Sequence, residues 1–349
     1  MTRMFEGSSV HRTWLLIAGF STAIAVSAAR VDAQAPAPPA PSAAQNAGEF
    51  SPIDTRILSD PLFLPRAGQV YGASAFTFNQ PTGTNTKNGV ETGSFTASDN
   101  SFDQTFAYGI TNRLAIRVAM GYAANTRDST AAATGDVTVG NTNGFNDPTF
   151  SATYRILDEL RSPLILDVTG SYSPDFFAAE AAGGGLNGTV ARGGQNAGLA
   201  VVLGREMTSF TIAGTMATTH VGEQTTALQS NETQTQSGAR WSYDAELNTQ
   251  TRFATRVSLN AGVTYTTAGN YVVSNLQTGN SHTYDAPATV ALNLAFNYHL
   301  VPNRLVGSFT YTYETYTEAK NVFSNASADT AVTNRTGNVV GLRFAYTFN

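Results

Sequence analysis

The chain combines a low charge density with a complete absence of cysteine, and both features limit the classes of protein it can belong to. Of its 349 residues 13% are charged, against about a quarter in typical soluble domains, and the net charge is −5. The acidic balance argues against a nucleic-acid-binding role, which needs a basic face. The lack of Cys excludes disulfides and thiolate metal sites.

The N-terminus has the layout of a secretory signal peptide. Arg3 and Arg12 give a weakly basic start, and the run from Trp14 to Val26 is apolar apart from one Ser and one Thr. A cleavage point with small residues follows at Val31-Asp32-Ala33. The alternative is an uncleaved anchor helix, but the apolar run is shorter than the roughly 20 residues that a membrane span needs. We therefore expect residues 1–33 to be removed on export.

Two segments of different composition follow the signal peptide. Residues 34–49 are mostly Ala and Pro, which predicts a stiff, extended linker. Residues 50–67 are richer in Ile, Leu and Phe, but Pro52, Pro61 and Pro65 forbid a long helix. The sequence therefore predicts a short turn or short helix in this N-terminal segment.

From Gly68 onward, apolar residues recur at every second position. In the last stretch Leu342 and Phe344 are apolar, whereas Arg343 and Ala345 are polar or small. A period of two over about ten residues predicts a strand with one apolar and one polar face, and this length suits a tilted strand that crosses a membrane. The chain contains about twelve such segments: 68–80, 101–111, 113–125, 147–157, 163–173, 194–206, 208–220, 238–251, 254–267, 286–299, 303–317 and 336–348.

The gaps between these segments indicate how the strands are connected. Even gaps are tight turns such as Thr111-Asn112-Arg113. Odd gaps are long and rich in Thr, Asn, Gly and Ser: 81–100, 126–146, 174–193, 221–237, 268–285 and 318–335. Short turns at one end and long loops at the other are typical of bacterial outer-membrane barrels, and a closed barrel leaves no unpaired sheet edge in the hydrocarbon.

We therefore predict an all-β fold, a transmembrane antiparallel up-and-down β-barrel over residues 68–349. An even number of strands that starts on the short-turn side places both termini in the periplasm. The segment 50–67 is then either periplasmic or a plug at the barrel mouth. A soluble periplasmic β-protein is the less favoured alternative, because it gives no reason for loop length to alternate six times.

The last strand resembles the C-terminal signal that the outer-membrane assembly machinery reads. Its sequence is V-V-G-L-R-F-A-Y-T-F-N, and that signal consists of a terminal aromatic residue preceded by apolar residues at every second place. The matching residues are Leu342, Phe344, Tyr346 and Phe348. This chain departs from the signal in one respect, because Asn349 follows the aromatic residue.

Two further stretches resemble barrels grouped under the phenol meta-degradation pathway. They read A-Y-G-I-T-N-R-L-A-I-R-V-A-M-G-Y (107–122) and G-F-N-D-P-T-F-S-A-T-Y-R-I (144–156). The positions that match the family's motif are Gly144, Asp147, Thr149, Tyr154 and Arg155, while Asn146 stands where the family usually has Gly. The resemblance covers roughly fifty residues and implies a channel for small organic molecules.

If the apolar residues at every second position face lipid, the residues between them face the lumen. Charged residues are expected in this second set, because an Arg on the lipid face costs about 2–4 kcal/mol at mid-depth. The candidate pore-lining residues are Asp103, Arg117, Arg155, Asp167, Asp244, Glu246, Arg256, Glu314 and Arg343. Arg155 with Asp167, and Glu246 with Arg256, are expected to pair across short turns. Two interpretations remain open: a constriction that selects permeants by charge, or pairs that neutralise each other and stiffen adjacent strands.

A barrel of this size is wide enough for a narrow pore unless something plugs it. The loop 174–193 is a candidate plug. Phe176, Phe177 and the Ala-rich stretch to Ala182 could fold a helical turn inward, with Gly183-Gly184-Gly185 as its hinge.

The expected function is passive uptake of small solutes, including aromatic or hydrophobic compounds, through an outer-membrane channel. The alternative is a closed barrel with a structural, adhesive or surface-recognition role through its long loops. We expect no enzyme, cofactor or metal, because no His has the spacing of a catalytic relay and no metal-binding motif occurs. The expected partners are outer-membrane lipid, lipopolysaccharide and the barrel-assembly machinery.

Overall fold

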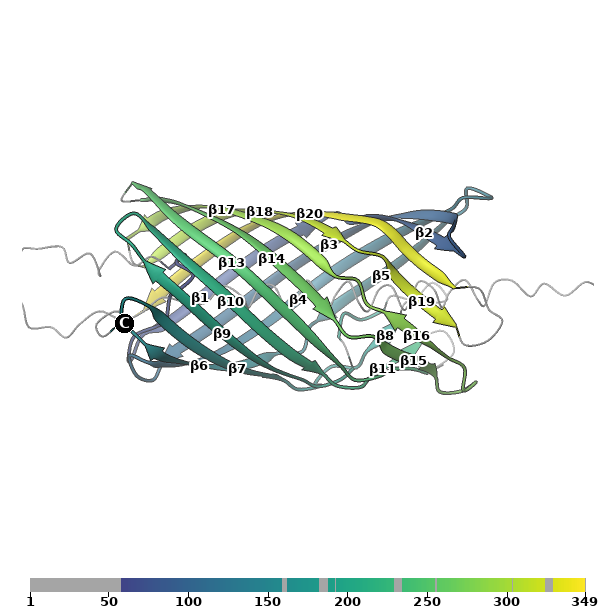
Figure 1. The fold of residues 1–349 in the computed structure, drawn as a ribbon, viewed down its shortest axis with the longest axis horizontal. Coiled ribbons are helices and arrows are strands. Elements are labelled where there is room, and N and C mark those ends of the chain that lie inside the picture. Colours follow the sequence, from purple (N-terminus) through teal and green to yellow (C-terminus); the bar gives the residue numbers. More distant parts are fainter. Residues whose placement is uncertain are drawn as a thin grey trace, which may run out of the picture.

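Twelve long antiparallel strands close into one barrel (Figure 1). The computed structural model describes residues 58–158, 162–181, 188–191, 193–228, 234–254, 256–302, 304–323 and 329–348. The expected signal peptide at 1–33, the linker at 34–49 and residues 50–57 lie outside the described residues. Within the described ranges, no helix has the length and apolar character needed to cross a membrane.

The barrel strands follow one another around the wall in chain order. They are β1 (Val70–Asn79), β3 (Val90–Gly109), β4 (Leu114–Ala131), β6 (Thr149–Leu157), β7 (Ile165–Ser173), β9 (Asn196–Glu206), β10 (Phe210–Val221), β13 (Arg240–Ala254), β14 (Val257–Ala268), β17 (Thr289–Val301), β18 (Leu305–Tyr316) and β20 (Thr330–Phe348). Each pairs antiparallel with the next, and β20 pairs with β1 from Val70↔Phe348 to Asn79↔Val339, which closes the barrel. The predicted fold class is confirmed, and every predicted segment overlaps one of these strands.

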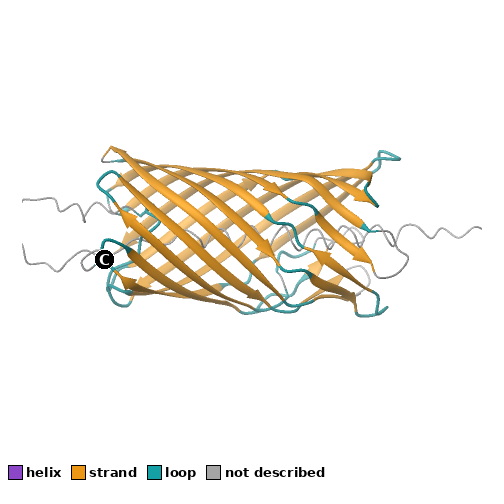
Figure 2. Cartoon of the chain, in the orientation of Figure 1, coloured by secondary structure: helices purple, strands orange, loops and turns teal. Residues whose placement is uncertain are grey.

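Eight further strands extend the wall at the end of the barrel that carries the long connections (Figure 1). They are β2 (Thr82–Lys87), β5 (Val137–Phe145), β8 (Glu180–Ala181), β11 (Gln224–Leu228), β12 (Gln234–Ser237), β15 (Tyr271–Asn275), β16 (Ser281–Asp285) and β19 (Ala319–Phe323). We call this the long-loop end, and the opposite end, where tight turns join the strands, the short-turn end. Figure 2 shows that strands (orange) make up the barrel wall and that loops and turns (teal) join them at its two ends.

The predicted long loops are therefore partly strand, which corrects the sequence-based boundaries. β3 has 20 residues, β4 has 18 and β20 has 19, against the roughly 9–11 that cross a bilayer. Beyond the bilayer both faces of a strand meet polar surroundings, so the apolar alternation that marks a membrane strand disappears while the hydrogen-bonded ladder continues. Thr, Asn and Ser fill these extensions, and their composition resembles that of loops.

The outer face of the barrel is apolar. One cross-strand row links neighbouring strands through directly opposed residues: Tyr122, Phe102, Phe76, Leu342, Phe309 and Phe296. Each of these side chains is about half exposed, from 41% at Tyr122 to 52% at Leu342. An exposed apolar belt of this extent is stable only against lipid, since water would oppose it.

The lumen at the short-turn end is filled by the chain itself. Residues 58–65 are buried and pack against inward-facing side chains of the wall, and no helix forms there. Leu62 clusters with Ile165, Val202 and Ala213. Leu58 and Phe63 belong to a second cluster whose other members are Tyr71, Ala73, Ala107, Val306 and Ala345. We call residues 58–65 the N-terminal plug.

Candidate functional site

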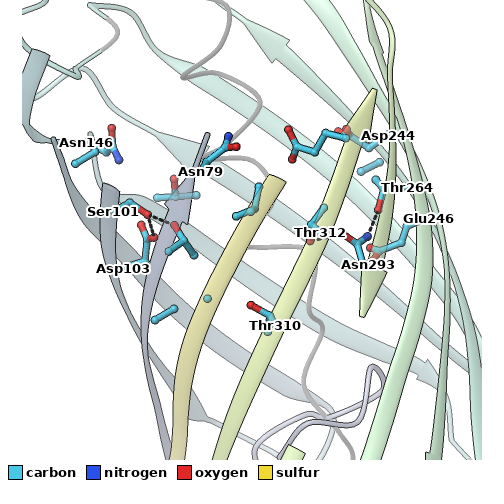
Figure 3. Close-up of a pocket in the computed structure, with 18 of the residues that line it drawn as sticks. Asn79, Ser101, Asp103, Asn146, Asp244, Glu246, Thr264, Asn293, Thr310 and Thr312 are labelled. Atoms are coloured by element: carbon cyan, nitrogen blue, oxygen red, sulfur yellow. Dashed lines mark hydrogen bonds between the residues drawn. The ribbon is translucent and has the colours of Figure 1, made fainter. Parts of the chain in front are cut away.

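A cavity of about 430 Å³ lies in the lumen, between the N-terminal plug and the long-loop end. Its wall is made mostly of uncharged Ala, Thr, Ser and Asn side chains. Figure 3 shows polar side chains of β1 and β3, such as Asn79 and Ser101, on one side and those of β14, β17 and β18, such as Thr264, Asn293 and Thr312, on the other. The volume falls within the range of about 300–1,000 Å³ that is typical of small-molecule sites.

Six of the nine predicted inward residues line this cavity: Asp103, Arg117, Asp244, Glu246, Glu314 and Arg343. The arginines lie on one side of the wall, whereas the acidic residues lie on both sides. Both arginines lie on β4 and β20, which flank β1 and β3, whereas Asp244 and Glu246 lie on β13, half-way around the strand order. Figure 3 shows Asp103 and these two acidic side chains on opposite sides of the lumen.

Hydrogen bonds hold several of these charged groups in place. Ser101 Oγ donates to Asp103 Oδ2 at 2.9 Å, and Thr266 Oγ1 donates to Asp244 Oδ1 at 2.7 Å. Arg343 Nη2 donates to the Tyr71 hydroxyl at 2.6 Å. The cavity wall therefore presents charges that are fixed by neighbouring side chains, a property that suits recognition of a solute.

Arg155 and Asp167 form the predicted pair, but they lie against the N-terminal plug and do not line the cavity. Arg155 Nε and Nη2 donate to the two carboxylate oxygens of Asp167, each at 2.7 Å, and the side chains are 0% and 1% exposed. Arg155 Nη2 also donates to the Leu62 carbonyl at 2.7 Å. The geometry favours the second of the two interpretations for this pair, because its charges satisfy each other and anchor the plug.

Polar contacts tie the N-terminal plug to other parts of the wall. Thr211 Oγ1 donates to Asp60 Oδ2 at 2.9 Å, and Arg252 lies 3.4 Å from the same oxygen. Burial raises the pKa of the Asp60 carboxyl above its usual value, while Thr211 and Arg252 act in the opposite direction. Asn260 Nδ2 donates to the Ser59 carbonyl at 2.8 Å. The plug is therefore fastened by polar as well as apolar contacts.

The expected pair of Glu246 and Arg256 is absent. β13 runs on to Ala254, with a register shift between Arg252 and Ala254, so the turn lies near Arg256 and not near residue 251. Arg256 is exposed in this turn and does not line the cavity. Glu246 lies further along β13, directly opposite Thr264. The expectation was wrong because β13 continues beyond residue 251 as far as Ala254, and the polar stretch at its end does not show in the sequence where the strand stops.

Four charged residues that sequence reasoning missed also line the cavity: Asp99, Arg127, Asp147 and Arg335. Three of them lie in stretches that were assigned to loops. Arg127 and Arg335 each stack on an aromatic ring, with Cζ 3.8 Å from the Phe95 ring centre and 4.1 Å from the Tyr316 ring centre. In β4 every second side chain points inward, and following this alternation from Ala123 through position 125 would have identified Arg127 as an inward residue.

The described part of the loop 174–193 contains no helical turn, which corrects that expectation. Glu180–Ala181 instead form the short strand β8, parallel to β11. Asp147 Oδ1 accepts hydrogen bonds from the backbone N–H groups of Phe176 and Phe177 at 2.8 and 2.9 Å, and such contacts hold this loop to the wall. The proposed hinge Gly183-Gly184-Gly185 lies outside the described residues.

No family model matches this chain, and no curated protein is similar to it. Among solved structures, an outer membrane channel from Pseudomonas putida F1 superposes with a TM-score of 0.53 at 16% identity, covering 86% of this chain and 100% of that one. The transport unit of the autotransporter AIDA-I from Escherichia coli gives a TM-score of 0.51 at 10% identity, covering 79% and 90%. This chain shares its fold with both of these structures, and it is a β-barrel of the outer-membrane type.

Proposed function

We propose that the protein is an outer-membrane channel for the passive passage of small solutes. The observation that carries the proposal is a cavity of about 430 Å³, lined by polar and small apolar side chains, inside a closed barrel whose outer face is apolar. A polar lumen inside a lipid-facing wall is the arrangement by which barrels conduct water-soluble molecules. The fold shared with the Pseudomonas putida channel is consistent with this role.

The permeants in this proposal are small organic molecules, including aromatic or hydrophobic compounds. Alanine side chains such as Ala97, Ala123 and Ala295 interrupt the polar lining, so that a solute with an apolar body meets apolar as well as polar wall. The motif at 144–156 that resembles the phenol meta-degradation barrels points in the same direction.

The N-terminal plug decides how freely solutes pass. It fills the lumen at the short-turn end and is hydrogen-bonded to β6, β10 and β14 through Arg155, Thr211 and Asn260. We infer that conductance of the intact protein is limited by this plug. Passage then requires either a narrow path beside it or its displacement.

A closed barrel with a structural, adhesive or surface-recognition role is the second candidate. The same plug favours it, because a lumen filled by buried side chains at one end is also what a non-conducting barrel needs. The strands that extend the wall at the long-loop end would then carry the role. The two candidates differ in whether solute crosses the barrel.

Solute flux into proteoliposomes separates them. Vesicles that contain the refolded chain should swell in a pentose solution faster than empty vesicles, and more slowly in a trisaccharide of the same osmolarity. Swelling equal to that of empty vesicles with every solute, from a barrel shown to be folded by its heat-modifiable gel mobility, would favour the closed barrel.

The membrane environment and assembly route form part of the proposal. The half-exposed aromatic belt would contact outer-membrane lipid and lipopolysaccharide. Phe344 and Phe348 face outward on β20, the strand that closes the barrel against β1. We infer that the assembly machinery reads this strand, with Leu342 and Tyr346 as the other members of the signal.

A further inference from the structure

Two buried arginines face the cavity near the long-loop end. Arg127 on β4 is 7% exposed and Arg335 on β20 is 8% exposed, and both line the cavity. In each, the Nε atom is buried and has no hydrogen-bond partner within the described residues. A buried N–H group without a partner is costly to a fold, so both arginines keep hydrogen-bonding capacity that the described residues do not use.

Aromatic rings fix the orientation of both guanidinium groups. Phe95 lies under Arg127 and Tyr316 under Arg335, with Cζ-to-centre distances of 3.8 and 4.1 Å. The Tyr316 hydroxyl is itself held by the Glu314 carboxylate. Because each ring covers a face of its guanidinium, hydrogen bonding is left to the guanidinium edge, where the N–H groups form a fork that matches a carboxylate.

Charged groups near the two arginines act on them from a distance and not through direct ion pairs. Arg127 and Arg335 repel each other, and Asp99 on β3 attracts both. Across the part of the chain that the structure describes, no carboxylate lies within ion-pair distance of either guanidinium. Asp99 therefore attracts both arginines without contacting either, and neither guanidinium is neutralised by a direct ion pair within the described residues.

We propose that Arg127 and Arg335 form a binding site for the carboxylate of a small organic acid inside the lumen. The proposal deepens the channel function by naming a class of permeant, but binding itself does not require that the barrel conducts. The carboxylate would meet the guanidinium edges, and its uncharged body would extend toward Ala97 and Ala123 in the cavity below. Asp99 makes a monoanion a better fit than a dianion such as phosphate, because it offsets one of the two positive charges.

A fluorinated benzoate tests this directly, by fluorine NMR line broadening on the refolded full-length mature barrel in detergent. The matched neutral probe is the corresponding fluorinated benzamide, which has the same shape without the charge. We expect benzoate to bind and benzamide to bind at least about tenfold more weakly, the factor expected from losing a charge-assisted hydrogen bond. Inorganic phosphate should compete poorly. Equal binding of the two aromatic probes, or stronger binding of phosphate, would overturn the proposal.

Three variants assign the binding to these residues. Arg127→Gln and Arg335→Gln should each weaken benzoate binding roughly tenfold. The control is Arg240→Gln, because Arg240 is equally buried and stacks on Tyr271 in the same way but does not line the cavity. It should leave benzoate binding unchanged. An equal loss in all three variants would mean that the arginines stabilise the barrel and do not bind the ligand.

A variant that binds benzoate more tightly than the wild type cannot be explained by misfolding. Asp99→Asn should strengthen benzoate binding, since it removes the negative charge that competes for both arginines. Unchanged or weaker binding in this variant would contradict the charge argument. A barrel that swells in sugar solutions but ignores benzoate refutes this inference alone, whereas one that binds benzoate without any flux refutes only the channel.

Discussion

Removing Arg155 should destabilise the barrel more than removing both members of its ion pair. Arg155→Met leaves the Asp167 carboxylate 1% exposed, with neither of its two 2.7 Å hydrogen bonds from Arg155. Breaking one side of a buried pair typically costs about 3–5 kcal/mol, because the remaining charge has lost both water and partner. The double variant Arg155→Met, Asp167→Leu removes that stranded charge.

The bond from Arg155 to the Leu62 carbonyl sets the size of the remaining effect. It is 2.7 Å long and involves a charged donor, so its loss costs about 1.5–3 kcal/mol in either variant. We therefore expect the double variant to lose about that amount and the single variant to lose more. The partly buried pair Arg113–Asp158, whose side chains are 31% and 14% exposed, is the matched control. Arg113→Met should destabilise the barrel less than Arg155→Met, because water reaches both members of this pair.

The assay is equilibrium unfolding by guanidinium chloride in lipid vesicles, followed by tryptophan fluorescence. Loss of the plug contact should also appear as faster protease cleavage within residues 58–65 in both Arg155 variants. The reasoning is refuted if the single and double variants unfold at the same denaturant concentration, or if Arg113→Met destabilises as much as Arg155→Met.

Three further predictions concern the wall, the cavity and the orientation. Leu292→Arg should cost about 2–4 kcal/mol and impair assembly, because Leu292 is 55% exposed on the lipid face. Asn293→Arg should be tolerated, because Asn293 lies on the cavity side. Equal amounts of folded barrel from the two variants would contradict the assignment of the two faces of β17. The double variant Arg117→Ser, Arg343→Ser should shift the reversal potential in a salt gradient toward cation selectivity, since it removes two positive charges from the cavity wall. A variant that conducts without this shift would mean that the two arginines only make structural contacts within the wall. Protease added to intact cells should cleave within 126–146 or 221–237 and spare the turn at 158–162; cleavage there would reverse the orientation.

The membrane strands could be predicted from the sequence because lipid imposes a strict rule on them. A strand such as β17 must put Leu292, Leu294 and Phe296 outward, and all three are about half exposed on the barrel surface. The same rule identifies the inward side chains, as with Glu246 and Arg343. The rule fails where lipid ends, and β5, β15 and β16 therefore escaped detection.

The contents of the lumen could be predicted only in part. Leu58, Leu62 and Phe63 are plainly apolar, but they have no period, so the sequence cannot say against which strands they pack. The arginine pair was missed for a related reason. Arg127 and Arg335 are 208 positions apart, and only closure of β20 against β1 brings their strands to the same side of the barrel.

Single-channel recording in a planar bilayer tests the central claim most directly, with three forms of the refolded chain. These are the mature chain, a deletion of residues 50–65 that removes the N-terminal plug, and a control deletion of residues 34–49 that keeps it. We predict small, stable ohmic steps from the mature chain and the control, and larger steps from the plug deletion, because only the latter empties the short-turn end of the lumen. Silence from all three forms, each correctly folded by heat-modifiable mobility, would contradict the assignment of this barrel as a channel.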